Sequence, residues 1–282
     1  MRITSLAGRL QLVTGSGMVD VESESEGRFG PDPQSVFPRW SEFRSWAGEH
    51  GAASGDATAS LPENPDLAAP VPRPAQVFAV GLNYQAHVSE AGRDRPDAPV
   101  TFTKFPSCLT GPYTTIALPG ERVDWEVELV VVMGETVRNG RLEDAWGQVA
   151  GLMVGQDLSE REVQLRPPTP QFSLGKSFPQ FGPTGPVLVT PDEFSDPDDL
   201  AISCAVNGEE VQSAKTSQMI FSVPEVIVAL SAIVTLLPGD LIFTGTPSGV
   251  GNARKPPKYL TPGDELTSYI ENIGTMRHTF TR

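Results

Sequence analysis

The chain has 282 residues, of which 39% are hydrophobic and 20% are charged, a composition typical of a folded globular protein with a substantial buried core. Its formal net charge of −14 argues against nucleic acid or an anionic membrane as a partner, because both require a basic face. The two cysteines, Cys108 and Cys204, stand far apart and near no histidine, so neither a disulfide framework nor a zinc cluster is expected.

No targeting or membrane segment is expected. The first residues contain no apolar stretch long enough for a signal peptide. The longest apolar stretch, residues 223–240, is interrupted by proline and by charged residues, so it is unsuited to cross a bilayer. These features predict a cytoplasmic protein.

Residues 1–70 are predicted to form a small N-terminal domain that ends in a proline-rich linker. Residues 9–15 and 17–23 alternate like the two strands of a short hairpin, and residues 39–50 have helix-compatible spacing. Closely spaced prolines in residues 61–76 are typical of a stiff, extended linker. We therefore expect the domain boundary near residue 70.

Residues 71–282 are predicted to form a β-rich domain of the α+β class. Ser222 and Glu225 have the spacing of a capping box, so a helix is expected to start there, with Pro224 in its first turn. Many short strands with few helices favour this class over a doubly wound sheet. The strand-like runs are residues 77–81, 100–105, 124–134, 151–157, 185–190, 201–209, 240–245 and 265–274.

The run at residues 124–134 carries the first candidate site. Alternate side chains of a strand share a face, so Asp124, Glu126 and Glu128 would point the same way. Carboxylates on a strand that becomes buried repel each other unless a cation compensates them, whereas a solvated edge would leave them in scattered salt bridges. Asp157 follows another apolar run and is either a third ligand or a helix N-cap. An all-oxygen set of this kind suits Mg²⁺, Mn²⁺ or Ca²⁺.

Four further polar residues are candidates for substrate contacts. Arg161 and Gln164 are three residues apart, so they either line one helical face together or lie on a solvated turn. Lys176, on a loop of Gly, Pro and aromatic residues, would bind an anionic group or extend to the surface. The Thr246 hydroxyl and the N–H groups of its Gly-rich turn could hold a carboxylate, although a tight turn explains the glycines equally well.

His87 and Glu90 form the remaining pair. Their spacing of three residues brings them into hydrogen-bonding range on one helical turn. A carboxylate against an imidazole fixes its tautomer and raises its basicity, as a general base requires, whereas the alternative is an ordinary surface turn.

Taken in chain order, these segments resemble the successive motifs of the fumarylacetoacetate hydrolase family. The motifs are GLNYQAHVSE, DWEVELVVVMG, GQDLSEREVQ, FSLGKSFPQFGPTGP, VNGEEVQSAKTSQMIF, PGDLIFTGTPSGVG and PPKYLTPGDEL. The resemblance runs from about residue 71 to the end of the chain and implies a mixed β-sheet roll around a divalent metal, Mg²⁺ or Mn²⁺ with Ca²⁺ as an alternative in crystals, in a homodimer.

The resemblance also implies roles for nine residues. The metal ligands would be Glu126, Glu128 and Asp157, and the catalytic residues would be His87, Glu90 and Lys176, with His87 and Glu90 on a lid that orders when substrate binds. Arg161, Gln164 and Thr246 match substrate-binding positions. The chain departs from the family pattern at Gln156, where many members have Asn, and at Pro179 and Gln180, where an Asp-Thr pair is common.

The implied reaction is metal-dependent hydrolysis of a C–C bond in a β-diketo (2,4-dioxo) acid such as an acylpyruvate. Glu90 would orient His87, which would activate the attacking water. The alternative is an oxaloacetate decarboxylase or a 2-oxo-enoic acid isomerase or tautomerase, because the same metal-chelated enolate serves these reactions. A non-catalytic metal-binding protein is the third hypothesis, and the presence of His87, Glu90 and Lys176 argues against it. In each enzymatic case the partner is a small 2-oxo acid.

Overall fold

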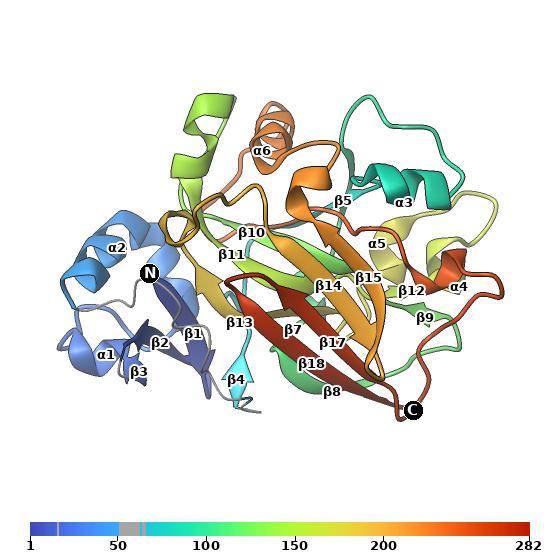
Figure 1. The fold of residues 1–282 in the computed structure, drawn as a ribbon. Coiled ribbons are helices and arrows are strands. Elements are labelled where there is room, and N and C mark those ends of the chain that lie inside the picture. The colour runs from blue at the N-terminus through green and yellow to red at the C-terminus, as the bar shows by residue number, and fades with distance from the viewer. Residues whose placement is uncertain (16, 51–62, 64–65) are drawn as a thin grey trace.

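Three β-sheets organise the computed structural model, which describes residues 1–15, 17–50, 63 and 66–282 (Figure 1). The largest sheet has the order β3 (Gly17–Asp20), β2 (Arg9–Thr14), β1 (Arg2–Leu6), β13 (Gly182–Val189), β11 (Val149–Gln156), β10 (Val127–Met133), β16 (Leu241–Phe243), β5 (Val77–Gly81) and β6 (Val100–Thr103), with β4 (Leu67–Ala68) on β1 and β7 (Leu109–Thr110) on β13. The second has the order β15 (Glu209–Lys215), β14 (Ala201–Val206), β17 (Glu265–Ile270), β18 (Gly274–Thr281) and β8 (Tyr113–Ala117), and the third pairs β12 (Ser159–Glu160) with β9 (Val123–Asp124).

The helices of the described chain are short and connect or cover the sheets. They are α1 (Val21–Glu24), α2 (Trp40–Glu49), α3 (Gln85–Glu90), α4 (Arg161–Gln164), α5 (Phe172–Gly175) and α6 (Val223–Ser231). Single 3-10 turns or short 3-10 segments lie at Pro33–Arg39, Pro106–Cys108, Leu142–Gln148, Pro191–Glu193, Thr216–Gln218 and Gly251–Ala253. None of these helices is both long enough and apolar enough to cross a membrane.

The observed elements confirm the predicted fold class, a strand-rich α+β fold with mixed sheets. The hairpin is formed by β2 and β3, but its second strand, expected over residues 17–23, ends at Asp20 because α1 begins at Val21 with Asp20 as its N-cap. Helix α2 lies within the segment predicted to be helical. The capping box of α6 is present, since Ser222 Oγ accepts the Glu225 N–H and Glu225 Oε2 accepts the Ser222 N–H at 2.8 Å. Residues 124–134, expected as one strand, form two, because β9 ends at Asp124 and pairs with β12 while β10 begins at Val127.

Strand β10 lies between two hydrophobic cores. Its odd-numbered side chains, such as Val127 and Leu129, pack in the core that the second sheet covers, whereas Val130 and Val132 pack in the core that contains the aromatic side chains of α2. This alternation follows from the period of two along a strand. Glu128 therefore lies on the face of Val130 and Val132, but at the end of the strand that α2 does not cover.

The strands of the N-terminal segment continue the largest sheet. Strand β1 is antiparallel to β13, with Ile3 opposite Leu188, and Thr4 Oγ1 donates a hydrogen bond of 2.7 Å to Pro186 O. Figure 1 shows this segment, in blue, beside the rest of the sheet. The predicted boundary near residue 70 stays a prediction about domains, and part of the proline-rich linker lies outside the described residues.

Candidate active site

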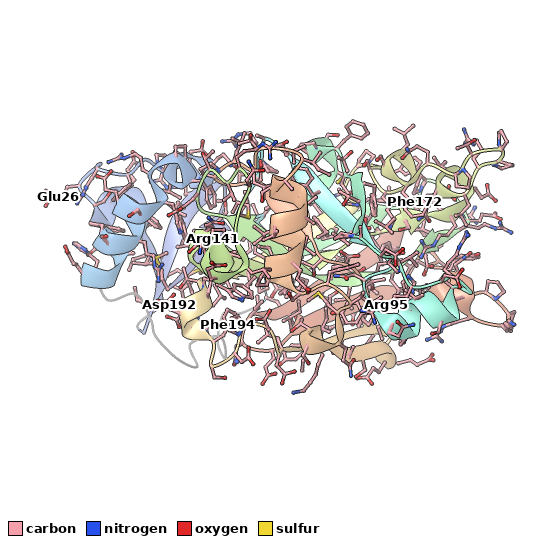
Figure 2. The ribbon with its side chains drawn as sticks, turned by 90° about the horizontal axis from the view of Figure 1, so that it is seen from above. Glu26, Arg95, Arg141, Phe172, Asp192 and Phe194 are labelled. Carbon is pink, nitrogen blue, oxygen red and sulfur yellow. The ribbon has the colours of Figure 1, made fainter. Side chains whose placement is uncertain are left out.

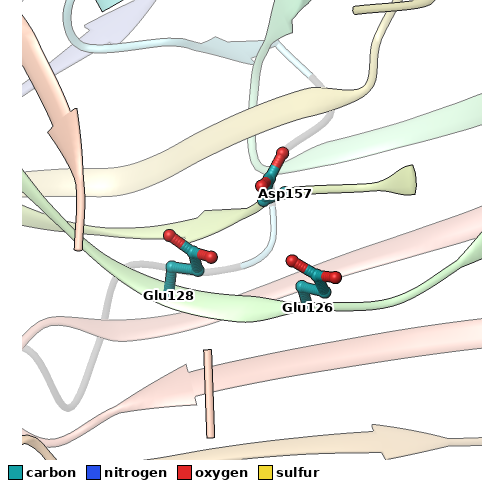
Figure 3. A group of neighbouring side chains, drawn as sticks. All are labelled: Glu126, Glu128 and Asp157. Atoms are coloured by element: carbon teal, nitrogen blue, oxygen red, sulfur yellow. The ribbon is translucent and has the colours of Figure 1, made fainter. Parts of the chain in front are cut away.

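Three buried carboxylates meet at one end of β10 and β11. Glu126 directly precedes β10, Glu128 lies within it, and Asp157 directly follows β11. One oxygen of each side chain lies within 4.8 Å of the others. Figure 3 shows Glu126 and Glu128 on one continuous stretch of backbone, with their carboxylates on the side of Asp157. The two glutamates therefore share a face, as the alternation predicted, and Asp157 joins them from the neighbouring strand.

Buried cations surround this acidic triad. The Lys176 ammonium lies 2.7 Å from Glu126 Oε2 and 2.6 Å from Asp157 Oδ2. Lys104 Nζ donates a hydrogen bond of 2.7 Å to Asp157 Oδ1, and Arg161 Nη2 lies 2.7 Å from Glu126 Oε1. Both oxygens of Glu126 and both oxygens of Asp157 are thus paired with a cation.

The charges of this cluster do not balance. Arg161 also pairs with Asp124 at 2.6 Å, so the cluster consists of four carboxylates (Asp124, Glu126, Glu128 and Asp157) and three cations (Lys104, Arg161 and Lys176). Among the described residues, no lysine or arginine lies within ion-pair distance of Glu128. One negative charge is therefore left without a cationic partner in a buried site.

The pKa values reflect this imbalance. Burial, together with the charges of Asp157 and Glu126, raises the pKa of Glu128 well above its usual value. Burial would also raise the pKa of Glu126, but Lys176 and Arg161 outweigh it and lower that pKa to about 2. A buried carboxylate next to two others resists ionisation unless positive charge is added.

These residues fit a divalent metal ion. Glu126, Glu128 and Asp157 supply the oxygen donors that Mg²⁺ and Mn²⁺ prefer, and a divalent cation would compensate the unpaired charge of Glu128. An ionised carboxylate oxygen that accepts one hydrogen bond keeps a second lone pair, so the ion pairs of Glu126 and Asp157 leave ligand capacity. The set contains no sulfur or imidazole donor that would favour a softer ion.

The Gly-rich turn after β16 holds the carboxylates of the site by its backbone. Gly245 N–H donates to Glu128 Oε2 (2.8 Å), Gly249 N–H to both oxygens of Glu90 (2.9 and 3.1 Å), and the N–H groups of Gly251 and Asn252 to Asp124 (2.7 and 2.9 Å). The sequence suggested that such a turn could hold a carboxylate, and here three of the protein's own carboxylates occupy its donors. A Cβ at residue 251 would lie 1.9 Å from Lys258 O, so only glycine fits there.

Arg161 is fixed on three sides. Its Nε and Nη2 donate to Asp124 Oδ2 at 2.9 and 2.6 Å, Nη2 also reaches Glu126, and Nη1 donates to Gln164 Oε1 at 2.8 Å. Because the Gln164 carbonyl oxygen accepts from Arg161, the NH₂ end of its amide is the part left to donate. The predicted pairing of these two residues on α4 is thus present, and both side chains are buried.

His87 and Glu90 are in contact on α3. Nδ1 of His87 lies 3.2 Å from Glu90 Oε2, and the Gly249 N–H holds the same carboxylate. Glu90 as an acceptor places the imidazole proton on Nδ1 and leaves the lone pair on Nε2. This is the arrangement that a general base requires.

All nine predicted site residues line one cavity of about 330 Å³. They are His87, Glu90, Glu126, Glu128, Asp157, Arg161, Gln164, Lys176 and Thr246. The remaining wall includes apolar side chains from β6, α5 and neighbouring loops, among them Phe102 and Phe172, which contact each other edge to face. The structure therefore brings together residues that span positions 87–246, while their individual roles stay predictions.

Thr246 and Gln156 are engaged in internal hydrogen bonds. The Thr246 hydroxyl donates to Val127 O at 3.0 Å and accepts from Gln212 Nε2 at 2.8 Å. Gln156, where many family members have Asn, is fully buried, and its Oε1 accepts the Glu126 N–H at 2.9 Å. Its Nε2 donates to Ser268 Oγ at 2.9 Å, so Gln156 joins the backbone of Glu126 to the second sheet.

Lys104 and Asp124 were not assigned roles from the sequence. Lys104 is fully buried beside Asp157, and a lone lysine at the end of the run VTFTKF is the only sequence signal for it. Strand alternation predicts the face on which Asp124 lies, but its contacts with Arg161 and with the Gly-rich turn depend on long-range pairings that sequence spacing does not reveal.

Comparisons with known proteins identify the family of this chain. Residues 76–281 match the family description Fumarylacetoacetate (FAA) hydrolase C-terminal. The chain is 47% identical over 210 residues to the mitochondrial oxaloacetate tautomerase FAHD2A of Homo sapiens, covering 74% of this chain and 67% of that protein.

Two solved structures are similar along most of the chain. An HpcE-like protein from Mycobacterium smegmatis is 53% identical with a TM-score of 0.92, over 100% of this chain and 99% of that one. A fumarylpyruvate hydrolase from Pseudomonas aeruginosa, in complex with Mn²⁺ and pyruvate, is 29% identical with a TM-score of 0.68. The match covers 81% of this chain and 95% of that one. The chain therefore belongs to the fumarylacetoacetate hydrolase family of enzymes.

Proposed function

We propose that this enzyme interconverts the keto and enol forms of a 2-oxo acid, with oxaloacetate as the first substrate to test. The observation that carries the proposal is the His87–Glu90 pair, whose base faces the same cavity as the buried acidic triad. The 47% identity to an oxaloacetate tautomerase supports this reaction over the hydrolysis that the family resemblance first implied.

The substrate carboxylate would be bound by the donors that remain free of internal partners. Each of the three ammonium hydrogens of Lys176 has an acceptor in the protein, namely Glu126, Asp157 and Ser159. Nη1 of Arg161 keeps one N–H beyond its bond to Gln164, and the Gln164 amide keeps its NH₂ group. These two groups would orient the carboxylate, while Lys176 provides positive charge close to the oxygen that becomes negative.

Proton transfer would be carried out by His87. Its Nε2 accepts a proton from C3 of the keto acid, the electrons of that C–H bond form the C2=C3 double bond, and the π electrons of the carbonyl move to the C2 oxygen. Protonation of this oxygen gives the enol, and the reverse sequence returns the ketone. A divalent cation held by Glu126, Glu128 and Asp157 would supply Lewis-acid polarisation of the carbonyl. Glu90 keeps the imidazole in the required tautomer through Nδ1.

Hydrolysis of a 2,4-dioxo acid is the second candidate, supported by the likeness to a fumarylpyruvate hydrolase. The same imidazole would then take a proton from water rather than from carbon. Decarboxylation of oxaloacetate would use the same cavity, and fold alone does not select among these reactions.

A substrate panel with Mg²⁺ or Mn²⁺ tests the proposal. We expect the enzyme to accelerate the decay of enol absorbance for oxaloacetate above the rate of enzyme-free metal controls. Release of CO₂ at the rate of enol decay would identify a decarboxylase instead. Formation of pyruvate from an acylpyruvate, without faster enol decay for oxaloacetate, would identify a hydrolase.

Three further predictions belong with this function. We predict that the metal is Mg²⁺ or Mn²⁺. We also predict that the protein is a homodimer, and size-exclusion chromatography with light scattering would test this assembly. We also predict a cytoplasmic location, whereas the human relative is named as mitochondrial.

A further inference from the structure

Two of the cationic side chains that line the cavity are already paired with the protein's own carboxylates. Lys176 is bound to Glu126 and Asp157, and Arg161 to Asp124 and Glu126. Their positive charge therefore serves the acidic triad and the end of the substrate that lies beside it. A second anionic group, further along the substrate, needs another cation.

Arg93 lines the same cavity and is exposed, three residues after Glu90. Its backbone N–H donates to Val88 O at 3.1 Å, which ties this residue to the end of α3. Its guanidinium forms no hydrogen bond or ion pair with any side chain among the described residues. Glu90 does not neutralise it, because the Glu90 carboxylate is directed to the Gly249 N–H and to His87.

The rest of the cavity wall offers a second anion one uncharged amide, that of Asn252, whose Oδ1 accepts from the Tyr259 hydroxyl at 2.8 Å. Leu82, Phe102, Leu165, Phe172 and Val250 are apolar and provide no side-chain donor. A carboxylate against such side chains would lose its hydration without compensation. A guanidinium presents several N–H donors in a planar fork that matches a carboxylate, and it is charged at any physiological pH.

We propose that Arg93 binds the distal carboxylate of the substrate, so that the preferred substrate is a 2-oxo dicarboxylic acid rather than a 2-oxo monocarboxylic acid. This inference rests on the proposed function and adds to it a residue that selects the substrate. Because Arg93 lies at the exposed side of a cavity in a chain of net charge −14, it also provides positive charge where an anionic substrate enters.

The test compares oxaloacetate with 2-oxobutanoate, which has the same four carbons but a methyl group in place of the distal carboxylate. In D₂O, each catalysed keto–enol cycle breaks a C3–H bond and forms a C3–D bond, so NMR gives kcat and KM for both compounds after subtraction of the enzyme-free rate. The variants are Arg93→Gln and, as a matched control, Arg95→Gln. Arg95 is exposed on the same segment, beside α3 (Figure 2), and does not line the cavity.

We expect Arg93→Gln to raise KM for oxaloacetate about tenfold, because a charge-assisted hydrogen bond is lost. KM for 2-oxobutanoate and kcat for both compounds should stay within about twofold, and Arg95→Gln should match the wild type. An unchanged preference for oxaloacetate in Arg93→Gln, with exchange intact, would overturn this inference alone. If the wild type exchanged the C3 hydrogens of neither compound, the proposed function would be overturned and this inference with it.

Discussion

Lys104 Nζ donates a hydrogen bond of 2.7 Å to Asp157 Oδ1, and both side chains are fully buried. Replacing Lys104 by Met removes this charge while Asp157 stays in place. Breaking a buried ion pair by removal of one partner typically costs about 3–5 kcal/mol, so the free energy of unfolding should fall by that order. Urea unfolding followed by fluorescence measures it.

Lys215→Met is the matched control for Lys104→Met. Lys215 pairs with Asp199 at 2.6 Å, a similar distance, but both side chains are solvent-exposed. Exposed pairs contribute little because water and salt screen them. If the two variants lost equal stability, the burial of Lys104 would not be the reason for its effect.

His87→Ala should reduce turnover about 10²–10⁴-fold, the usual effect of removing a general base. Metal-dependent thermal stabilisation should persist, since His87 is not among the proposed ligands. Glu90→Gln should have a smaller effect on kcat, because it weakens the orientation of His87 without removing the base. His50→Ala is the control, since His50 lies at the end of α2 and bonds to Trp46 O at 2.7 Å. Near wild-type activity of His87→Ala would show that another group transfers the proton.

Glu128→Gln should separate the charge repulsion within the acidic triad from its binding of a metal ion. In metal-free buffer the variant should be at least as stable as the wild type, because the one carboxylate without a cationic partner becomes neutral. With saturating Mg²⁺ the wild type should gain thermal stability that the variant largely lacks. Differential scanning calorimetry with EDTA and with Mg²⁺ measures both. Glu135→Gln, an exposed glutamate after the far end of β10, should behave as wild type. Equal stabilisation of Glu128→Gln by Mg²⁺ would argue against Glu128 as a ligand.

His278, which lies outside the active site, should make the free energy of unfolding depend on pH. Burial lowers its pKa to about 3, although a bond to Thr114 opposes the shift. Below the unfolded pKa of about 6.5 the unfolded chain binds a proton that the native protein does not. Stability should therefore fall as the pH falls from about 6.5 toward 3, with a slope of at most about 1.4 kcal/mol per pH unit from this residue. His278→Asn should flatten the unfolding free energy between pH 6 and pH 4 relative to wild type, whereas His50→Asn should not.

The local elements of this fold could be predicted from the sequence because their signals are local. The capping box at Ser222, the His87–Glu90 turn and the shared face of Glu126 and Glu128 each depend on spacing within a few residues. The order of the motifs along the chain then joined these pieces into one family, which the match to residues 76–281 confirms.

Long-range pairings could not be predicted in the same way. The contact between Lys104 and Asp157 joins residues 53 positions apart, and Asp124 reaches backbone donors 127 positions along the chain. Both depend on which strands are neighbours, for instance the parallel pairing of β16 with β5. Period-two alternation gives the face of a residue but not the strand beside it.

The pairing of β1 with β13 has a consequence for chimeric proteins. Every residue of β13 is buried, and Leu188 packs in the same core as Ile3, Leu10 and Phe43. A catalytic fragment that begins at residue 71 would present an unpaired strand edge and an uncovered apolar surface, which favours aggregation. An N-terminal segment grafted from another family member would have to supply a strand in the β1 register and a hydrophobic counterpart to Leu188. Its sequence can vary on the outer strand β3, which is exposed or half-buried, rather than on β1 or β2, whose side chains are mostly buried.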